Sequence, residues 1–291
     1  MLVQIFVNGL LVGGIYAMVA LGLNLVFGVL RIINFAHGHF LMLGMYAALT
    51  LWRYGLDPYV SILIVVPALF LFGALCERWL IRYTLAAPAH VKIFVTLGLA
   101  IAMENLALLV FKADYLSVKV PYQTSVWQVM GVSVSVTRTV AFAAMLATSA
   151  ALFLFLGRTD FGRAIRATAQ DRATARLMGI NVDRVQLITF AIGSAIVGLA
   201  ACLMMPIYAV YPTVGVEFVT AAFVIVVLGG LGSLHGALFG GLLIGVIEQA
   251  SAYFMDSALR QLVYFLLFMV VLAVRPAGLF GQRGAEEIGL K

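Results

Sequence analysis

The sequence predicts an all-α fold: a polytopic integral membrane bundle of eight to ten transmembrane spans, in one transmembrane domain over residues 1–291. Composition is the first reason, because 64% of the 291 residues are apolar and only 10% are charged, against about a quarter charged in soluble domains. Repeated apolar runs near the ~20 residues that cross a bilayer core are the second. These runs lack the alternation of membrane barrels, so helices must satisfy the backbone in lipid.

Nine apolar segments follow one another along the chain, and each predicts a helix. They cover residues 3–30, 33–52, 59–81, 93–111, 138–156, 185–210, 217–231, 235–254 and 260–274. The first lacks a basic start and a small-residue cleavage site, which favours a span over a removable signal. Six glycines in the fourteen residues from Leu228 to Gly241 loosen helices, so 217–254 is either two crossings or a broken helix with a re-entrant turn. Nine spans agree best with the charges.

Basic residues fall at every second boundary between these segments. They are Arg31, then Arg78, Arg82 and Lys92, then the arginines of 157–184, then Arg275 and Arg283. Since cytoplasmic loops are enriched in Lys and Arg, this pattern places the amino terminus and the 112–137 loop outside. The carboxyl terminus is expected in the cytosol.

The segment from Gly157 to Arg184 concentrates the charge, with six arginines and three aspartates. Thr159 or Asp160 predicts the N-cap of a helix beginning near Phe161, and Gly179 predicts its end. Two interpretations stay open on physical grounds. The helix either lies at the headgroups, where its arginines are attracted to anionic lipid, or docks a protein partner through its arginines and Asp171.

Polar side chains inside the apolar segments are the candidates for a translocation pathway, because an ionisable group at bilayer depth costs ~2.5–3.5 kcal/mol or more. Glu104 and Asn105 lie in the middle of one span, where a purely structural carboxyl is the alternative. Asn34, His37 and Gly38 crowd the start of another helix, whose N-terminus suits a carboxylate. A gate, a cap or a subunit contact fits these three equally well. No metal site is expected, since His37 and His39 point to different sides of a helix.

Several separated blocks resemble the branched-chain amino acid ABC importer permeases, and the resemblance covers nearly the whole chain. The pattern Gly162-Arg163-Ala164-x-Arg166-Ala167, followed by Asp171, Ala175, Gly179, Ile180 and Asn181, resembles the cytoplasmic motif of that family. The first 50 residues resemble its opening, and "VVLGGLGSLHGALFGGLLIG" and "RPAGLFG" resemble its closing motifs.

The resemblance implies a permease subunit of an importer in the bacterial inner membrane, for branched-chain amino acids or related small solutes. It implies four kinds of partner: the lipid bilayer, a second related permease subunit, two cytoplasmic ATPases, and a periplasmic solute-binding protein. Segment 158–184 would be the coupling helix, and its expected ATPase-coupling residues are Gly162, Arg163, Arg166, Asp171, Ala175, Gly179 and Ile180.

Motifs that the sequence lacks also favour a membrane subunit that depends on separate ATPase subunits. The sequence has no G-x-x-x-x-G-K-[ST] phosphate loop and no Gly-Lys dipeptide, so ATP is expected on partner subunits and no cofactor in this chain. No enzyme is predicted, because Ser233 and His235 have poor geometry for a triad and a G-x-S-x-G elbow is absent. The sequence has no basic patch interleaved with aromatic residues, so nucleic-acid binding is not predicted. The alternative function is an ion-coupled secondary transporter that needs no ATPase.

Overall fold

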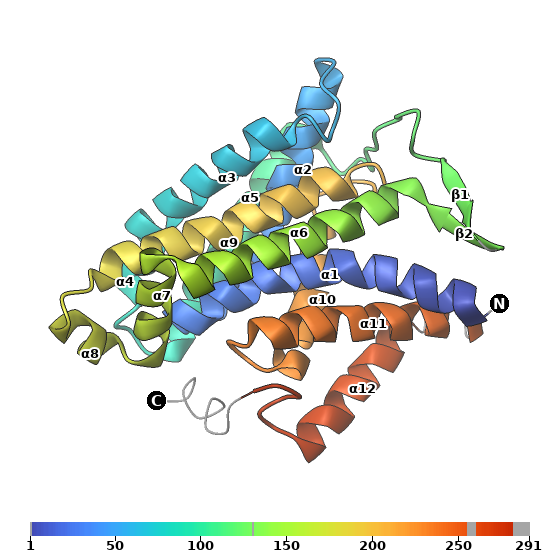
Figure 1. Cartoon of the computed structure of the whole chain (residues 1–291). Helices are drawn as coiled ribbons and strands as arrows, with labels where there is room; N and C mark the ends of the chain where they lie inside the picture. The colour runs from blue at the N-terminus through green and yellow to red at the C-terminus, as the bar shows by residue number, and fades with distance from the viewer. Residues whose placement is uncertain (1, 130, 255–259, 282–291) are drawn as a thin grey trace.

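The computed structural model describes residues 2–129, 131–254 and 260–281, and these residues form an elongated bundle of helices with one small β-hairpin (Figure 1). Arg283 lies outside the described residues. The helices are α1 (Leu2–Leu30), α2 (His37–Arg53), α3 (Ile62–Cys76), the π-helical turn η1 (Glu77–Ile81), α4 (Arg82–Thr84), α5 (Ala89–Phe111), α6 (Val136–Arg158), α7 (Asp160–Gln170), α8 (Arg172–Leu177), α9 (Val182–Met204), α10 (Val214–Gly229), α11 (Leu234–Phe254) and α12 (Arg260–Val274).

Each of the nine predicted apolar segments contains a helix in the structure. Six helical stretches among the described residues are long and apolar enough to cross a membrane: α1, the continuous run from α3 through α4, α5, α6, α9 and α11. The apolar helices α10 and α12 are shorter, and α2 has 17 residues. The all-helical membrane fold is therefore confirmed at this coarser level.

Two groups of three helices make up the centre of the bundle. One half is α1, α2 and α3, and the other is α9, α10 and α11; α1 packs mainly on α11, and α9 mainly on α3. The central helices α1 and α9 are the most buried of the long ones and run in opposite directions (Figure 1). Oppositely oriented halves of this kind are common in transporters.

In each half, the second helix begins beside the middle of the bundle instead of at its end. The ring nitrogen Nε2 of His37 lies 3.1 Å from the carbonyl oxygen of Val19, about three-fifths of the way along α1. The first residues of α2 also meet the first residues of α10: a Cβ at Gly215 would lie 2.7 Å from the Gly38 carbonyl oxygen, and a Cβ at Gly38 would overlap the Gly215 carbonyl. Only glycine fits at this crossing. The predicted helix over 33–52 therefore starts four residues late, after an irregular return segment.

Glycines also allow α1 and α11 to pack with their backbones in contact. A Cβ at Gly9 would lie 2.6 Å from the Val246 Cα, a Cβ at Gly241 would lie 2.5 Å from the Ala17 Cα, and a Cβ at Gly245 would overlap the backbone of Gly13. Small residues that bring backbones close drive helix association in membranes, where lipid removes the hydrophobic driving force.

Gly245→Ala is therefore expected to lower the free energy of unfolding by about 1–3 kcal/mol, because the added methyl group overpacks this seam. Gly98→Ala is the matched control, since a Cβ at Gly98, also inside a membrane helix, meets nothing within 4 Å. The comparison is made by thermal unfolding of the two purified variants in one detergent. Equal unfolding temperatures would contradict the seam.

The two ends of the bundle differ in character (Figure 1). One end carries the antiparallel hairpin of β1 (Val126–Val129) and β2 (Val132–Ser135), which the sequence did not predict within the 112–137 loop; the side-chain amide of Gln4 donates to the Ser133 carbonyl there, at 2.6 Å. The opposite end, here called the basic end, carries α7, α8 and the end of α1. It gathers Arg31, Arg82, Lys92 and the arginines of 158–184.

Candidate functional site

At the basic end, α7 is fixed tightly to the end of α6. The Thr159 hydroxyl oxygen accepts a hydrogen bond from the Gly162 N–H at 2.9 Å, which confirms the predicted N-cap. A Cβ at Gly162 would lie 2.6 Å from the Leu156 Cα, so this glycine serves close packing. Arg163 is exposed and pairs with Asp160 on its own helix, while Arg166 is also exposed.

The predicted single helix from Phe161 to Gly179 is wrong in one respect, because it breaks at Asp171 into α7 and α8. The Asp171 backbone is extended, and one carboxylate oxygen accepts the N–H groups of Ala173 at 2.8 Å and Thr174 at 3.2 Å. The other oxygen accepts the Thr174 hydroxyl at 2.7 Å. These bonds, the hydroxyl's first, lower the pKa of the Asp171 carboxyl. Asp171 thus remains an anion and starts α8 as its N-cap.

The end of α8 presents two apolar side chains to the outside. Leu177 is 87% exposed and Met178 is 77% exposed. The turn that follows is tightly held, since Gly179 has a φ of +83° and the Ile180 N–H donates to the Ala175 carbonyl at 3.1 Å. Ala175 itself is buried. We call Leu177 and Met178 the α8 tip.

The sequence interpretation missed the α8 tip because it rested on the arginines and on the motif of small and charged residues. The signal was present: two consecutive apolar residues directly before a glycine that ends a helix, inside an otherwise polar segment. An exposed apolar pair on such an element typically marks a contact with another protein.

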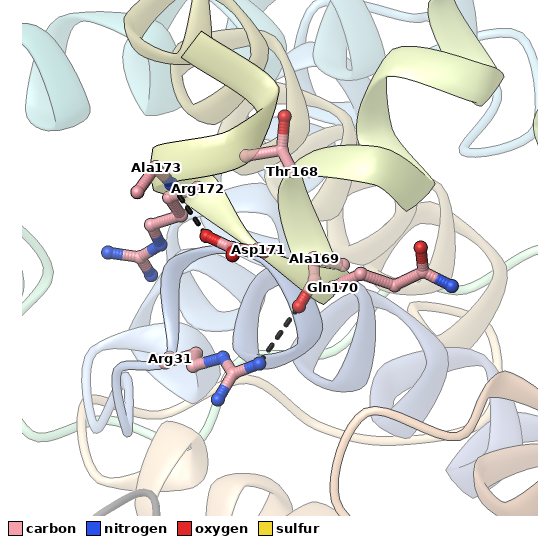
Figure 2. Close-up of a pocket in the computed structure, with 7 residues that line it drawn as sticks. All are labelled: Arg31, Thr168, Ala169, Gln170, Asp171, Arg172 and Ala173. Carbon is pink, nitrogen blue, oxygen red and sulfur yellow. Dashed lines mark hydrogen bonds between the residues drawn. The ribbon is translucent and has the colours of Figure 1, made fainter. Parts of the chain in front are cut away.

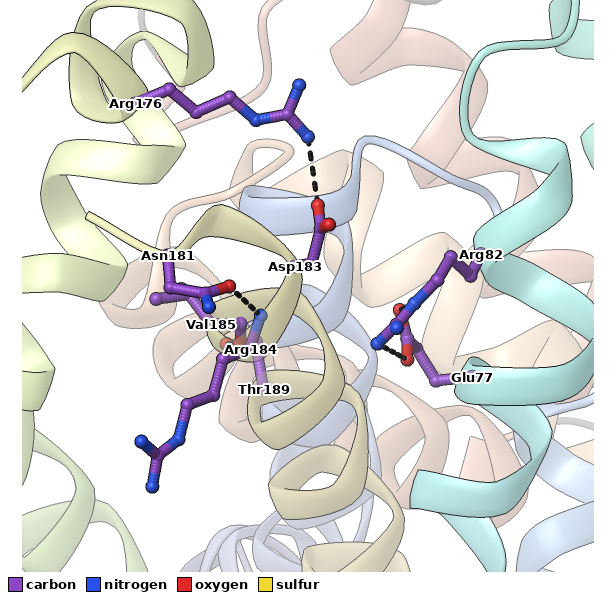
Figure 3. A network of polar contacts seen from close by, with 8 residues as sticks. All are labelled: Glu77, Arg82, Arg176, Asn181, Asp183, Arg184, Val185 and Thr189. Atoms are coloured by element: carbon purple, nitrogen blue, oxygen red, sulfur yellow. Dashed lines mark hydrogen bonds and ion pairs between the residues drawn. The ribbon is translucent and has the colours of Figure 1, made fainter. Parts of the chain in front are cut away.

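Polar contacts connect α8 to the start of α9 (Figure 3). The Arg176 guanidinium pairs with the Asp183 carboxylate at 2.9 Å, and the Asn181 side-chain oxygen accepts the Arg184 N–H at 3.0 Å as the N-cap of α9. Arg176 and Asp183 are both more than half exposed, so their pair contributes little stability. Its effect is to orient the turn between the two helices.

A second ion pair nearby is buried (Figure 3). The Arg82 guanidinium contacts the Glu77 carboxylate at 3.0 Å; the Glu77 side chain is fully buried and that of Arg82 is 34% exposed. Glu77 opens the π-helical turn η1, and such turns recur at functional sites. The sequence analysis treated Arg82 only as a boundary charge and did not consider Glu77.

The predicted pathway residues lie on α5 and at the start of α2. Glu104, in α5, lies 3.2 Å from the Nε2 of His39 in α2, and its side chain is 25% exposed. His39 is buried, and its Nδ1 has no partner among the described residues. Asn105 is exposed beside Glu104 and donates only to the Ile101 carbonyl of its own helix, at 2.8 Å.

The other predicted pathway residues lie inside the joint where α2 begins. Asn34 and His37 are buried. The Asn34 side-chain oxygen accepts the Ala36 N–H at 3.1 Å, and the His37 ring is held by the Val19 carbonyl. Gly38 forms the crossing with α10. The three residues therefore come together with each other, and Glu104 contacts His39, the residue that follows them in α2.

Comparisons with known proteins agree with this architecture. The family model described as "Branched-chain amino acid transport system / permease component" matches residues 5–272. No solved structure shows a significant match to the chain.

Curated relatives match over nearly the full length. The high-affinity branched-chain amino acid transport system permease protein BraD of Pseudomonas aeruginosa is 33% identical, with 98% of this chain and 97% of that protein covered. The corresponding LivH protein of Escherichia coli K12 is 32% identical, with 97% and 96% covered. A fructose import permease protein of Rhizobium meliloti is 30% identical over 68% of this chain. The chain is thus a multi-pass membrane transport permease, not an enzyme, and belongs to the family of branched-chain amino acid transport system permease components.

Proposed function

We propose that this chain is the membrane-spanning permease subunit of an ATP-binding-cassette importer for branched-chain amino acids or related small solutes. The observation that carries the proposal is the α8 tip, an exposed apolar pair at the end of the molecule that gathers the arginines. The relatives named above are permease proteins of such amino acid transport systems by their printed names.

In this proposal the basic end faces the cytosol of a bacterial inner membrane, since positive residues favour the inner side. The chain then crosses the membrane eight to ten times. This count treats α2 and α10, which begin near mid-depth, as completing spans with the irregular segments before them. Broken helices of this kind are tolerated because protein surrounds them.

Segment 158–184 would couple the pore to ATP hydrolysis. The α8 tip would insert into a groove of a cytoplasmic ATPase, while Arg163 and Arg166 on the exposed side of α7 would form charge-assisted contacts around it. The remaining motif residues would act through shape. Gly162 holds α7 against α6, Asp171 starts α8, and the other three fix the turn behind the tip: Ala175, Gly179 and Ile180.

Three further partners complete the proposal: a second related permease subunit, a second ATPase, and a periplasmic binding protein at the hairpin end. ATP would bind the ATPases, because this sequence lacks a phosphate loop. We further propose that the part of α5 that carries Glu104 and Asn105 borders the translocation pathway. A partly exposed carboxyl facing lipid alone would be costly. Asn34, His37 and Gly38 would support the pathway by holding the start of α2.

Two variants at Glu104 test the pathway proposal. Glu104→Gln keeps an acceptor near His39 and removes the charge, whereas Glu104→Leu removes both. If the charge serves transport, both variants are expected to lower the uptake rate about tenfold in the assembled complex, equivalent to about 1.4 kcal/mol. Normal uptake by Glu104→Gln together with loss in Glu104→Leu would reduce Glu104 to a support for His39. Uptake of labelled solute into proteoliposomes is the measurement.

The overall function is tested by reconstituting the chain with its candidate partners. Uptake of labelled leucine is expected to require ATP, both permease subunits and the binding protein, and the chain alone is expected to show no ATPase activity. An ion-coupled carrier, the alternative, would take up solute alone when a proton or sodium gradient is imposed. Uptake by the lone chain under such a gradient would refute the proposal.

A further inference from the structure

A cavity of about 360 Å³ lies at the basic end, between the end of α1 and the turn that joins α7 to α8 (Figure 2). Its lining residues are Arg31, Thr168, Ala169, Gln170, Asp171, Arg172 and Ala173. The lining does not include the α8 tip, nor Glu104 and Asn105 of α5. In the proposed function the ATPase contacts are made by the α8 tip, Arg163 and Arg166, which lie outside this lining, although Asp171 of segment 158–184 is part of it.

Two arginines are held in place at this cavity from opposite sides. The Arg31 guanidinium, which follows α1, donates to the Ala169 carbonyl of α7 at 2.9 Å. The Arg172 guanidinium, in α8, donates to the Val29 carbonyl of α1 at 2.8 Å. Each guanidinium has five N–H groups. The bond just described uses one N–H group of each arginine. Their other N–H groups form no hydrogen bond with any of the residues that the structure describes, so they can bind a ligand.

Positive charge at the cavity exceeds the negative charge that faces it. Lys92, half-buried near the start of α5, is not part of the lining, but its charge and that of Arg172 repel each other. Burial lowers the pKa of Arg172, and repulsion from Arg31 and Arg176 lowers it further. The acid in the lining, Asp171, uses both carboxylate oxygens to cap α8. An anionic ligand would relieve this repulsion.

The depth of the cavity indicates which anion it meets. Arg31 directly follows Leu30, the last residue of one candidate span, and Lys92 lies in the first turn of another. Cations at the ends of spans lie at the level of the lipid headgroups, and basic pockets between spans on the cytoplasmic side bind anionic headgroups. The α8 tip lies farther out along α8, where a soluble partner would bind.

We propose that this cavity binds the phosphate group of an anionic phospholipid, with Arg31 and Arg172 of its lining as the cationic contacts and with Lys92 adding positive charge from the start of α5. The lipid would connect the end of α1 to the α7–α8 turn, and so help to set the position of the coupling segment. The assignment to the inner leaflet rests on the orientation in the proposed function. Binding itself does not depend on transport or on any ATPase.

The test uses the full chain, purified alone in a neutral detergent and titrated with phosphatidylglycerol. Bound lipid is counted by native mass spectrometry, and thermal unfolding is followed in parallel. Lys92→Gln and Arg172→Gln are each expected to weaken phosphatidylglycerol binding about tenfold, the equivalent of 1.4 kcal/mol. The matched control is Arg184→Gln, which removes the same charge from an exposed position outside the cavity and is expected to bind as the unaltered chain does. Lys92 forms no hydrogen bond through its side chain in the described structure, so its variant keeps the fold.

Two further measurements separate the sources of the anion. Phosphatidylcholine, which has a phosphate but no net charge, is expected to bind at least tenfold more weakly. Inorganic phosphate is expected to give no protection against unfolding at concentrations where phosphatidylglycerol protects. Equal phosphatidylglycerol binding by Lys92→Gln, Arg172→Gln and Arg184→Gln would overturn the proposal. Protection by inorganic phosphate alone would overturn the assignment to a lipid.

Discussion

Replacing the α8 tip by acids, in Leu177→Asp with Met178→Asp, is expected to lower ATP-driven uptake by the assembled complex at least tenfold. Both side chains are largely exposed in the chain, so the change costs little stability by itself. In the proposed complex they fill an apolar groove of the ATPase. Central, desolvated apolar anchors of this kind contribute about 2 kcal/mol or more to binding, and a buried carboxylate adds a desolvation penalty.

The matched control keeps the tip apolar. Leu177→Met with Met178→Leu conserves both volume and hydrophobicity, and uptake is expected to stay within about twofold of the unaltered complex, since such exchanges are well tolerated. Uptake and ATP hydrolysis are measured on the same proteoliposomes, together with the amount of ATPase that co-purifies. If the acidic pair transports as fast as the exchanged pair, the α8 tip has no part in coupling.

The sequence predicted the helical segments well, because the signal was strong and local. A run of apolar residues in a chain with 10% charge is helical wherever lipid or protein denies the backbone water. The charge pattern predicted that Arg31 and the arginines of 157–184 lie at the same end of the molecule. The structure agrees, because the side chain of Arg31 donates to the Ala169 carbonyl.

The points at which helices begin were predicted less well, because they depend on packing between distant segments. The late start of α2 follows from the crossing of Gly38 with Gly215, 177 positions later in the chain. Periodicity along one segment carries no information about that contact. The same holds for the break at Asp171, where an aspartate inside a helical pattern caps the next helix instead of facing solvent.

The candidate site was predicted in part, and the misses share a physical cause. Sequence reasoning favoured ionisable residues in apolar runs, and the pathway role of Glu104 stays a prediction of that kind. It missed Glu77, because a carboxyl five residues before an arginine near a span boundary resembles an ordinary interfacial charge. A buried carboxylate needs a counter-charge, whereas an exposed one does not. Glu77 is buried because α9 packs against η1, and a contact between these two distant segments cannot be read from the sequence.

Arg82→Gln is expected to destabilise the chain by about 3 kcal/mol, because it leaves the fully buried Glu77 carboxylate without its counter-charge. Removal of one partner from a buried pair costs about 3–5 kcal/mol, and the 34% exposure of the Arg82 side chain places the expected cost at the low end. Arg78→Gln is the matched control. It removes the same charge four residues earlier from an exposed position, and is expected to change stability by less than about 0.5 kcal/mol.

The double variant Glu77→Gln with Arg82→Gln distinguishes a charge effect from lost packing. If the uncompensated carboxylate is the cause, neutralising it restores most of the stability lost in Arg82→Gln, since replacing both partners of a buried pair is often close to neutral. If the arginine stem contributes mainly through packing, the double variant stays as unstable as the single one. Free energies of unfolding from denaturant titrations in one detergent decide between these results. Recovery would show that this pair fixes the conformation of η1 beside α9, while adding little net stability of its own.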